Sequence, residues 1–389
     1  MYKNILVSAL VNLGDVVLTT SALALIKKNF PSARITMLVK PVVADAVINN
    51  PVVDDVIVLD YRAKENSLSK MFSTVKNIRR RRFDLFISLD RKLRAALLAF
   101  LSRIPGRIGP SKVFDDKKSR VTALFTDVIS IDHDLDQTLQ ARTYQTIVKK
   151  FFEIDGWAEP VFARITDDAR ANVDRLFERL PTARLKIALC VKGTFALKTY
   201  PKEYFAEIVR TLRAEYDAAF FIVGAPADRE YAESFNGAPP PLPPTVAAPN
   251  RGSHAHPASA APAHNKPSVG QKESANEIIN FCGETSLIEL AEIFNRADLF
   301  ITVDTGAAHI AATTKIPMVV MFGCTPTKRW HPINPNAVAL SSNEPCCPCS
   351  FKPEQCPSHP KPDCLYHVKP ATVLDACRNL LEAHHELNR

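Results

Sequence analysis

Residues 298–314 read DLFITVDTGAAHIAATT, an apolar strand-like run followed by a polar turn and a helix of small residues. The pattern places Thr305 and Gly306 in the first turn of that helix, where unpaired backbone N–H groups and the helix dipole favour an anion. Asp304 ends the strand, and His309 follows one helical turn later. Close packing of the helix on a sheet, with a capping Asp or Thr, explains the small residues but accounts less well for a histidine on the buried side. The stretch therefore predicts an anion-binding turn at the edge of a parallel sheet.

The same alternation of short β-rich runs with helical periodicity extends along most of the chain. It predicts an α/β fold with parallel sheets covered by helices on both faces. Because 389 residues exceed the usual size of a single core, we expect two Rossmann-like domains. Strands are expected at 4–10, 34–39, 54–59 and 84–89, and again at 186–191, 219–223, 278–282, 299–303 and 318–322.

The domain limits follow from where the strand–helix pattern restarts. We expect a first domain at 1–180, a second at 181–370, and a C-terminal helix at 371–389 that packs back toward the first domain. Residues 236–275 interrupt the second domain with Pro, Ala, Ser, Gly, Asn and His and almost no large apolar side chains. This composition is typical of a disordered insertion.

Composition and charge narrow the class of protein. The chain is 46% hydrophobic and 23% charged, which is ordinary for a folded soluble protein, and its apolar runs are too short to cross a bilayer. The first ten residues lack the pattern of a secretory signal, so we expect a cytoplasmic protein.

The net charge of +8 and the pI near 9.0 suggest an anionic partner. Basic residues gather between Lys76 and Arg120, where either a solvated face or a patch that meets acidic lipid headgroups or a phosphorylated acceptor explains them. The patch lacks the interleaved aromatic residues of a nucleic-acid platform, so no nucleic acid is expected. Its members are Arg79, Arg80, Arg81, Arg82, Arg91, Lys92, Arg94, Arg103, Arg107, Lys112, Lys117 and Lys118.

Two further strand-to-helix turns carry charged residues. Asp15 follows the first strand, where it could cap the helix or act in catalysis, and the turn lacks the GxGxxG pattern of a nicotinamide cofactor site. Lys192, Thr194 and Lys198 lie on the loop that opens the second domain. Lysines on such a loop suit a diphosphate, although solvated lysines are equally common there.

Three segments together resemble a known family. NLGDVVLTTSALALIKKNFPSARITMLV, KGTFALKTYPKEYFAEIV and DLFITVDTGAAHIAATTKIPMVVMFGCT resemble glycosyltransferase family nine, the ADP-heptose:lipopolysaccharide heptosyltransferases. The resemblance implies a GT-B fold, with the two sheets facing a central cleft, the acceptor held by the first domain and the donor by the second. Tyr200 stands where the family usually has Trp, and Thr199 stands where a basic residue is frequent.

The resemblance also implies residue roles. Asp15 would be the general base that deprotonates the acceptor hydroxyl, and Lys198 would steady the departing diphosphate. Such enzymes invert the anomeric carbon without a catalytic metal, so lysine and helix N–H groups stabilise the leaving group instead. The residues expected to bind the donor are Lys192, Thr194, Lys198, Asp304, Thr305, Gly306 and His309.

Five cysteines, Cys346, Cys347, Cys349, Cys356 and Cys364, lie within one Pro-rich stretch. In a cytosolic chain such a group suggests a metal site more than a disulfide scaffold. Cys346, Cys349, Cys356 and Cys364 are the candidate ligands of a structural zinc or iron site, which would take no part in the transfer reaction.

The expected activity is transfer of heptose from ADP-heptose to the lipopolysaccharide inner core, a Kdo/heptose–lipid A acceptor. We expect the protein at the cytoplasmic face of the inner membrane, held peripherally by its basic patch. Two alternatives stay open: transfer to another acceptor, such as a protein or a different surface glycan, and nucleotide-sugar binding without turnover. Asp15 favours an enzyme, because binding alone needs no base on the acceptor side.

Overall fold

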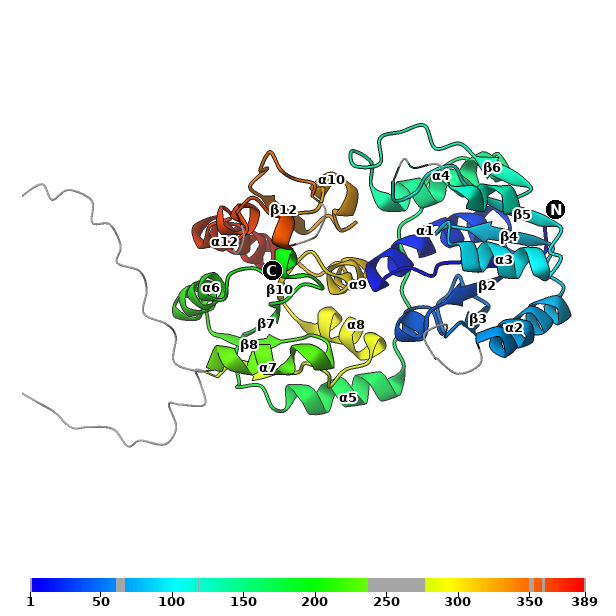
Figure 1. Cartoon of the computed structure of the whole chain (residues 1–389). Helices are drawn as coiled ribbons and strands as arrows, with labels where there is room; N and C mark the ends of the chain where they lie inside the picture. Colours follow the sequence, from blue (N-terminus) through cyan, green and yellow to red (C-terminus); the bar gives the residue numbers. More distant parts are fainter. Residues whose placement is uncertain are drawn as a thin grey trace, which may run out of the picture.

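The computed structural model describes residues 2–60, 67–115, 117, 119–236, 277–349, 353–358 and 361–387. Except for Asn236, the segment predicted to be a disordered insertion lies outside the described residues. No helix in the described ranges is long and apolar enough to cross a membrane. Figure 1 shows two α/β domains side by side.

The first domain is built on a six-stranded parallel sheet with the order β3-β2-β1-β4-β5-β6. Helices α1 and α4 cover one face, where they pack against alternate strand residues such as Ile5 and Val7. Helices α2 and α3 cover the other face, against Leu6 and Phe86. The elements are β1 (Asn4–Ser8), α1 (Leu13–Asn29), β2 (Arg34–Val39), β3 (Asp55–Val58), α2 (Ser67–Arg81), β4 (Leu85–Ser88), α3 (Leu93–Leu101), β5 (Gly106–Pro110), β6 (Asp127–Ile129) and α4 (Gln140–Phe152).

The second domain repeats this plan, with the order β12-β11-β10-β7-β8-β9 in a second parallel sheet of six strands. Helices α8 and α9 cover one face of the sheet, and α6 and α12 cover the other. The elements are α5 (Asp167–Phe177), β7 (Leu185–Cys190), α6 (Lys202–Glu215), β8 (Ala218–Ile222), α7 (Arg229–Glu233), β9 (Ile279–Asn280), α8 (Leu287–Arg296), β10 (Leu299–Val303), α9 (Gly306–Thr314), β11 (Met318–Phe322), α10 (Thr327–Trp330), β12 (Ala337–Ser341), α11 (Asp363–Tyr366) and α12 (Pro370–Leu387).

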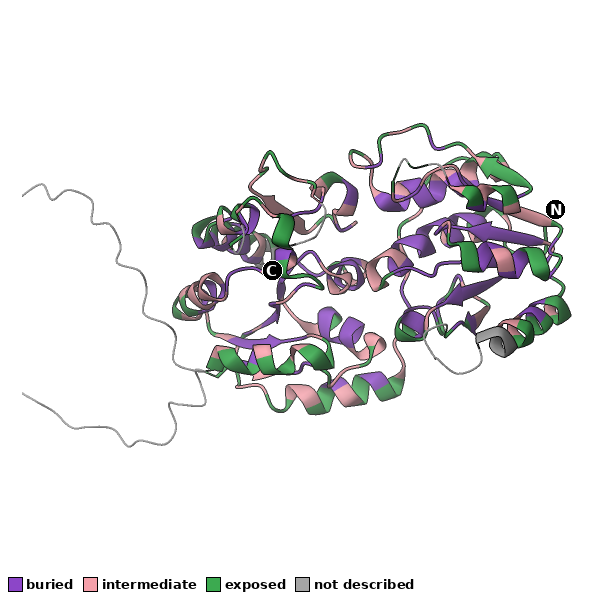
Figure 2. Cartoon of the chain, viewed as in Figure 1, coloured by how far each residue is buried: buried purple, intermediate pink, exposed green. Residues whose placement is uncertain are grey.

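Counted from the first strand of each domain, both sheets follow the order 3-2-1-4-5-6. In this doubly wound arrangement, ligands bind beyond the carboxyl ends of the strands, at the point where the strand order reverses. That point lies between β1 and β4 in the first sheet and between β7 and β10 in the second. Figure 2 shows that the central strands of both domains, such as β1, β4, β7 and β10, are buried. The fold therefore predicts a site where these two sheet edges meet.

Two helices lie differently from the sequence prediction. Helix α5 falls within the range given to the first domain, but it packs against α8 of the second, where Asp174 pairs with Arg296 at 2.7 Å. Helix α12, expected to return toward the first domain, packs against α6, β10 and β11 of the second. Its apolar residues Val373, Cys377 and Leu381 complete the core on that face of the second sheet, which explains its position.

Strands β5, β6 and β12 were not predicted. The glycines and proline in Gly106–Pro110 and the shortness of Asp127–Ile129 hide the β pattern of β5 and β6. In β12 every residue is only half-buried, as expected for an edge strand, so its hydrophobic signal is weak.

Candidate active site between the two domains

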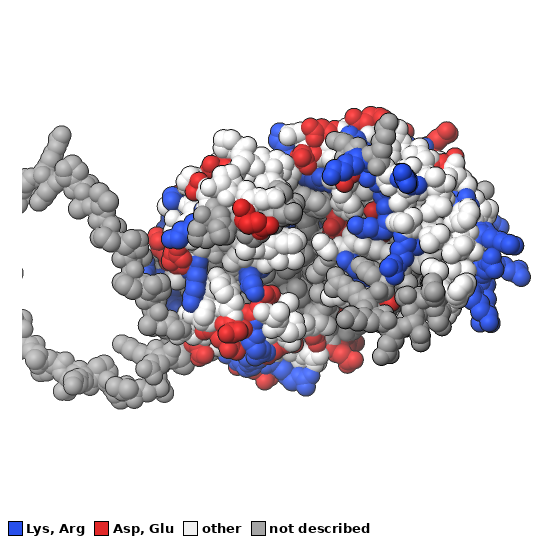
Figure 3. All heavy atoms as spheres, viewed as in Figure 1, with Lys and Arg blue, Asp and Glu red and all other residues white. Residues whose placement is uncertain are grey.

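A cavity of about 620 Å³ opens where the two sheet edges meet. Figure 3 shows the surface hollowed between the two domains. Seven of the residues singled out in the sequence line it, from three strand-to-helix turns: Asp15, Thr194, Lys198, Asp304, Thr305, Gly306 and His309. Lys192 is not among the lining residues, and its Nζ lies 3.2 Å from the carboxylate of Asp228 instead.

Asp15 lies in the first turn of α1, on the first-domain wall of the cavity. The hydroxyl of Tyr144, a fully buried residue of α4, donates a hydrogen bond to its Oδ1 at 2.8 Å. Burial raises the pKa of Asp15 to about 6, although Tyr144 and the positive charges of Arg329 and Lys198 act to lower it. A carboxylate with this pKa is ionised at neutral pH and is still basic enough to take a proton in a transition state.

Asp304 ends β10 and holds Lys198 on the opposite wall. The Nζ of Lys198 lies 2.7 Å from Oδ2 of Asp304, and the hydroxyl of Thr325 donates to the same oxygen at 2.6 Å. The loop before Lys198 folds back tightly, since a Cβ at Gly193 would lie 2.5 Å from the Lys198 carbonyl oxygen. The pairing therefore fixes a lysine at the cavity, where it can meet an anionic ligand.

The first turns of α1 and α9 lie in direct contact at the cavity. A Cβ at Gly306 would lie 2.9 Å from Cβ of Leu13, and a Cβ at Gly14 would lie 2.6 Å from Cδ2 of His309. Only glycines allow this approach. Two helix N-termini at close range give a concentrated positive potential, which an anion such as a phosphate stabilises.

His309 lies one turn into α9 and is 4% exposed. Burial lowers its pKa to about 4, so the imidazole is neutral at pH 7. Its Nδ1 has no hydrogen-bond partner among the described residues. A buried ring nitrogen without a partner at a cavity wall is suited to a hydrogen bond with a ligand.

The first-domain side of the cavity is basic, because Lys40, Lys92 and Arg94 line it together with Asp15. Lys92 and Arg94 belong to the basic stretch noted in the sequence, whereas Lys40 follows β2. This wall suits an acceptor that carries negative charge.

Sequence reasoning missed three residues of the site, namely Tyr144, Thr325 and Arg329. Thr325 had a detectable signal, since it follows a strand that ends at the same sheet edge as Asp304. Tyr144 lies 129 residues from Asp15 in the sequence, and Arg329 lies 189 residues from its first-domain partner Gln140. No local pattern could pair them.

The predicted metal site is not formed by its cysteines in this structure. Among the described residues no group of three or more His, Cys, Asp or Glu side chains could hold a metal ion. Cys346 is exposed, while Cys364 is buried in the core of the second domain. A hydrogen-bond contact with Cys364 and burial raise the pKa of Cys347 well above its usual value.

Tyr200, where the family usually has Trp, lies away from the cavity. Its ring is fully buried in the second domain, and its hydroxyl donates to the carbonyl oxygen of Val368 at 2.6 Å. The substitution therefore concerns the packing of the second domain rather than the lining of the site.

The sequence is similar to those of known glycosyltransferases. The model of glycosyltransferase family 9 (heptosyltransferase) matches residues 71–241 and 258–359. Lipooligosaccharide heptosyltransferase 2 of Campylobacter jejuni is 35% identical over 118 residues, which span 29% of this chain and 35% of that protein. Lipopolysaccharide heptosyltransferase 3 of Escherichia coli K12 is 23% identical over 336 residues, 84% of each chain.

Comparison by structure agrees. The glycosyltransferase family 9 protein from Veillonella parvula matches with a TM-score of 0.77 and 21% identity, over 98% of both chains. This likeness shows the fold, and two doubly wound domains with a site between them form the GT-B architecture that the sequence predicted. Because the family model matches well over half of the sequence, the chain belongs to glycosyltransferase family 9.

Proposed function

We propose that this protein is an inverting, metal-independent glycosyltransferase that moves heptose from ADP-heptose to the lipopolysaccharide inner core. One observation carries the proposal. Asp15 lies on the first-domain wall of the cavity, while Lys198 and the N-terminus of α9 lie on the second-domain wall. A base and a diphosphate site on opposite walls are what a single displacement at a sugar carbon requires.

The reaction follows from this placement. The Asp15 carboxylate accepts the proton of the acceptor hydroxyl as its oxygen attacks the anomeric carbon of the donor. The bond from that carbon to the diphosphate oxygen breaks, and the electron pair leaves with ADP. Lys198 and the N–H groups of Thr305 and Gly306 stabilise the charge that develops on the diphosphate.

Two observations support the choice of substrates. The relatives from Campylobacter jejuni and Escherichia coli are named for heptose transfer to lipooligosaccharide or lipopolysaccharide. Lys40, Lys92 and Arg94 line the acceptor side, and the Kdo sugars of an inner-core acceptor carry carboxylates that suit this wall. Another anionic surface glycan would also suit it, so the assay below includes one as a competing acceptor.

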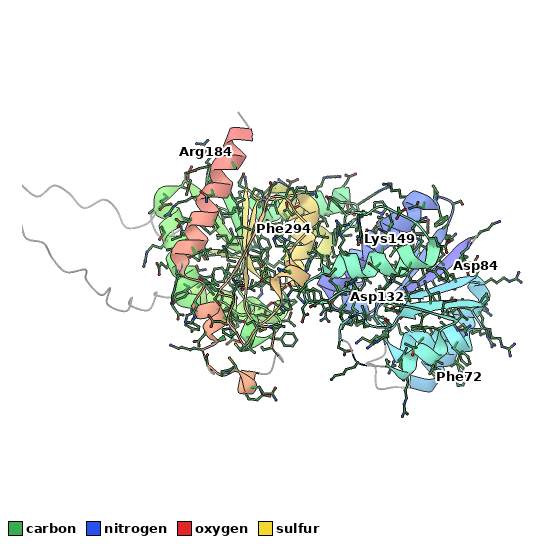
Figure 4. The ribbon with its side chains drawn as sticks, turned by 90° about the horizontal axis from the view of Figure 1, so that it is seen from above. Phe72, Asp84, Asp132, Lys149, Arg184 and Phe294 are labelled. Carbon is green, nitrogen blue, oxygen red and sulfur yellow. The ribbon has the colours of Figure 1, made fainter. Side chains whose placement is uncertain are left out.

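Part of the basic stretch supports peripheral contact with the cytoplasmic face of the inner membrane. On α2 and α3 the exposed apolar residues Phe72, Phe100 and Leu101 accompany exposed basic residues. Figure 3 shows Lys and Arg side chains gathered at the outer edge of the first domain, over α2, and Figure 4 labels Phe72 at this edge. Apolar and basic side chains together suit an anionic lipid surface. The basic members are Lys76, Arg79, Arg80 and Arg103.

The proposal is tested by ADP release from ADP-heptose, with a purified inner-core lipid acceptor and with EDTA present. We expect acceptor-dependent release that survives chelation in the wild type. In Asp15→Asn, transfer should fall by about 10²- to 10⁴-fold while the affinity for ADP-heptose is retained. Normal transfer by Asp15→Asn would refute the base assignment, and loss of release in EDTA would refute metal independence. Donor binding without release, across inner-core and other glycan acceptors, would support the binding protein instead.

A further inference from the structure

Arg329 belongs to α10 of the second domain, but its guanidinium is buried in the first. The residue is 6% exposed. Its Nε donates to Oε1 of Gln140 at 2.8 Å, and its two terminal nitrogens donate to the carbonyl oxygens of Val113 at 2.8 Å and Phe114 at 3.3 Å and to Oδ1 of Asp136 at 3.1 Å. A buried guanidinium with this many acceptors is well satisfied. These contacts exist only while the two domains are docked.

The contact with Gln140 continues to Asp15. Gln140 begins α4, and Tyr144 lies one helical turn further on, so their side chains are neighbours. Burial raises the pKa of the Tyr144 phenol, whereas the Gln140 side chain acts to lower it, as a donor group facing the phenol oxygen does. The Tyr144 hydroxyl donates to Oδ1 of Asp15 at 2.8 Å. A series of polar contacts thus links Arg329 to Asp15.

The donors and acceptors of these side chains determine which group donates at each contact between Arg329 and Asp15. A guanidinium has only donors, so the carbonyl oxygen of the Gln140 amide must face Arg329. The Gln140 amide nitrogen then serves as the donor: one of its N–H groups donates to the carbonyl oxygen of Val113 at 3.5 Å, and the other is available to the Tyr144 oxygen. The hydroxyl proton of Tyr144 points to Asp15.

We propose that Arg329 is a positioning residue that, through Gln140 and Tyr144, holds Oδ1 of Asp15 and leaves its Oδ2 for the acceptor hydroxyl. The inference rests on the proposed role of Asp15 as the base. In this proposal Asp15 is held in position only when the second domain is docked, since Arg329 comes from that domain. If Arg329 only joined the two domains, its side chain would need no link to Asp15.

The charged and titratable groups that face Asp15 come from four elements. They are Tyr144 of α4, Arg329 of α10, Lys198 of the turn after β7 and Asp304 at the end of β10. Tyr144 and Arg329 both act to lower the pKa of Asp15, so removing either raises it. The activity of an enzyme whose base is Asp15 should then require a higher pH.

The test is the pH dependence of kcat/KM for transfer in Tyr144→Phe and Arg329→Lys. Tyr144→Phe conserves volume, and Arg329→Lys keeps the charge but not the fork that fixes Gln140. In both variants we expect a fall of about tenfold in kcat at pH 7. We expect the acidic limb of the profile to move upward by about one pH unit in Tyr144→Phe, and by less in Arg329→Lys, where the positive charge that lowers the pKa of Asp15 is kept. The Kd for ADP should stay unchanged in Tyr144→Phe, because Tyr144 does not line the cavity.

Lys328→Ala is the matched control. Lys328 is the neighbour of Arg329 on α10 and also crosses to the first domain, where its Nζ donates to Oε1 of Gln137 at 2.8 Å, outside the series of contacts to Asp15. This variant should keep the wild-type pH profile. Thermal unfolding of each variant reports whether the fold is intact.

The outcomes separate the two proposals. If Asp15→Asn transfers normally, the proposed function fails. If Asp15→Asn is inactive while Tyr144→Phe and Arg329→Lys keep the wild-type pH limb and kcat, the positioning role of Arg329 fails and the base assignment stands. If Lys328→Ala moves the limb as far as Arg329→Lys does, domain contact alone explains the effect and the inference is overturned.

Discussion

Replacing Gly14 by Ala tests whether the two domains must approach as closely as this structure shows. The added Cβ would lie 2.6 Å from Cδ2 of His309, 3.4 Å from its Nε2 and 3.5 Å from Cα of Gly306. His309 is buried, so its ring has little room to move aside. The substitution should therefore push the first turns of α1 and α9 apart.

Two effects of opposite sign determine how much Gly14→Ala changes the free energy of the docked arrangement. Alanine in place of glycine favours the α1 helix by at most about 1 kcal/mol, in whatever position the domains take. Overpacking against His309 costs about 1–3 kcal/mol, and only when the domains are docked. The docked arrangement thus loses about 1–3 kcal/mol relative to the separated one, a factor of about 5 to 150 in the equilibrium between them.

The assay compares kcat/KM for transfer with thermal unfolding. Gly14→Ala should lower kcat/KM by about 10- to 100-fold and leave Tm nearly unchanged, because neither domain core is disturbed. Gly109→Ala is the contrasting control. Its Cβ would lie 2.2 Å from the ring of Phe125, inside the first domain, so that variant should lower Tm instead.

A double variant sharpens the result. His309→Ala removes the ring that Gly14→Ala would strike, so the radius of gyration measured by solution scattering should be smaller in the double variant than in Gly14→Ala alone. Wild-type kcat/KM in Gly14→Ala would refute the reasoning. A Tm loss as large as that of Gly109→Ala would also refute it, since the strain would then lie within a domain.

Three further predictions use the pairs described above. Lys198→Ala leaves the buried Asp304 carboxylate without its cation and should lower the free energy of unfolding in urea by about 3 kcal/mol. Lys198→Arg keeps the positive charge, so it should recover more of the wild-type stability than of the wild-type transfer activity. The pKa of Asp15 is raised to about 6 in the folded protein, so ionisation of its carboxyl group opposes folding. Above pH 6 the Asp15→Asn variant should therefore be more stable than the wild type, by on the order of 3 kcal/mol. This difference in stability should shrink as the pH falls toward 4. Tyr200→Phe leaves the Val368 carbonyl oxygen without its donor and should lower the unfolding free energy by about 1 kcal/mol with no change in transfer, as melting and ADP release would show.

Sequence periodicity predicted the two sheets well, because each central strand is buried on both faces and reads as a continuous apolar run. It could not predict on which domain a helix packs. The sequence of α5 shows an apolar side that includes Val173, but it does not show which domain that side meets. The position of α8 and the pair between Asp174 and Arg296 decide it. Helix α12 is the same case, since its partners lie in α6, β10 and β11.

The residues of the site also include some that the sequence could predict and some that it could not. Asp15, Lys198 and Asp304 could be predicted because each follows a strand at the carboxyl edge of its sheet, where chain order alone determines position. Tyr144 and Arg329 could not, because each reaches the site through a contact between elements far apart in sequence. Their side chains look locally like an ordinary helical tyrosine and an ordinary surface arginine.

The two domains share one strand order, and the two turns that meet at the cavity, after β1 and after β10, carry opposite chemistry. The turn after β1 presents the Asp15 carboxylate, whereas the turn after β10 presents helix N–H groups beside Lys198. A helix N-terminus favours an anion in both places, so topology alone would make both turns anion sites. In the first domain the residue itself supplies the anion, and burial keeps it basic. In the second domain the anion must come from the ligand. The repeated fold therefore determines where the reaction can occur. In the proposed mechanism, one carboxylate on one side of the cleft determines its direction, from a donor on the second domain to an acceptor on the first.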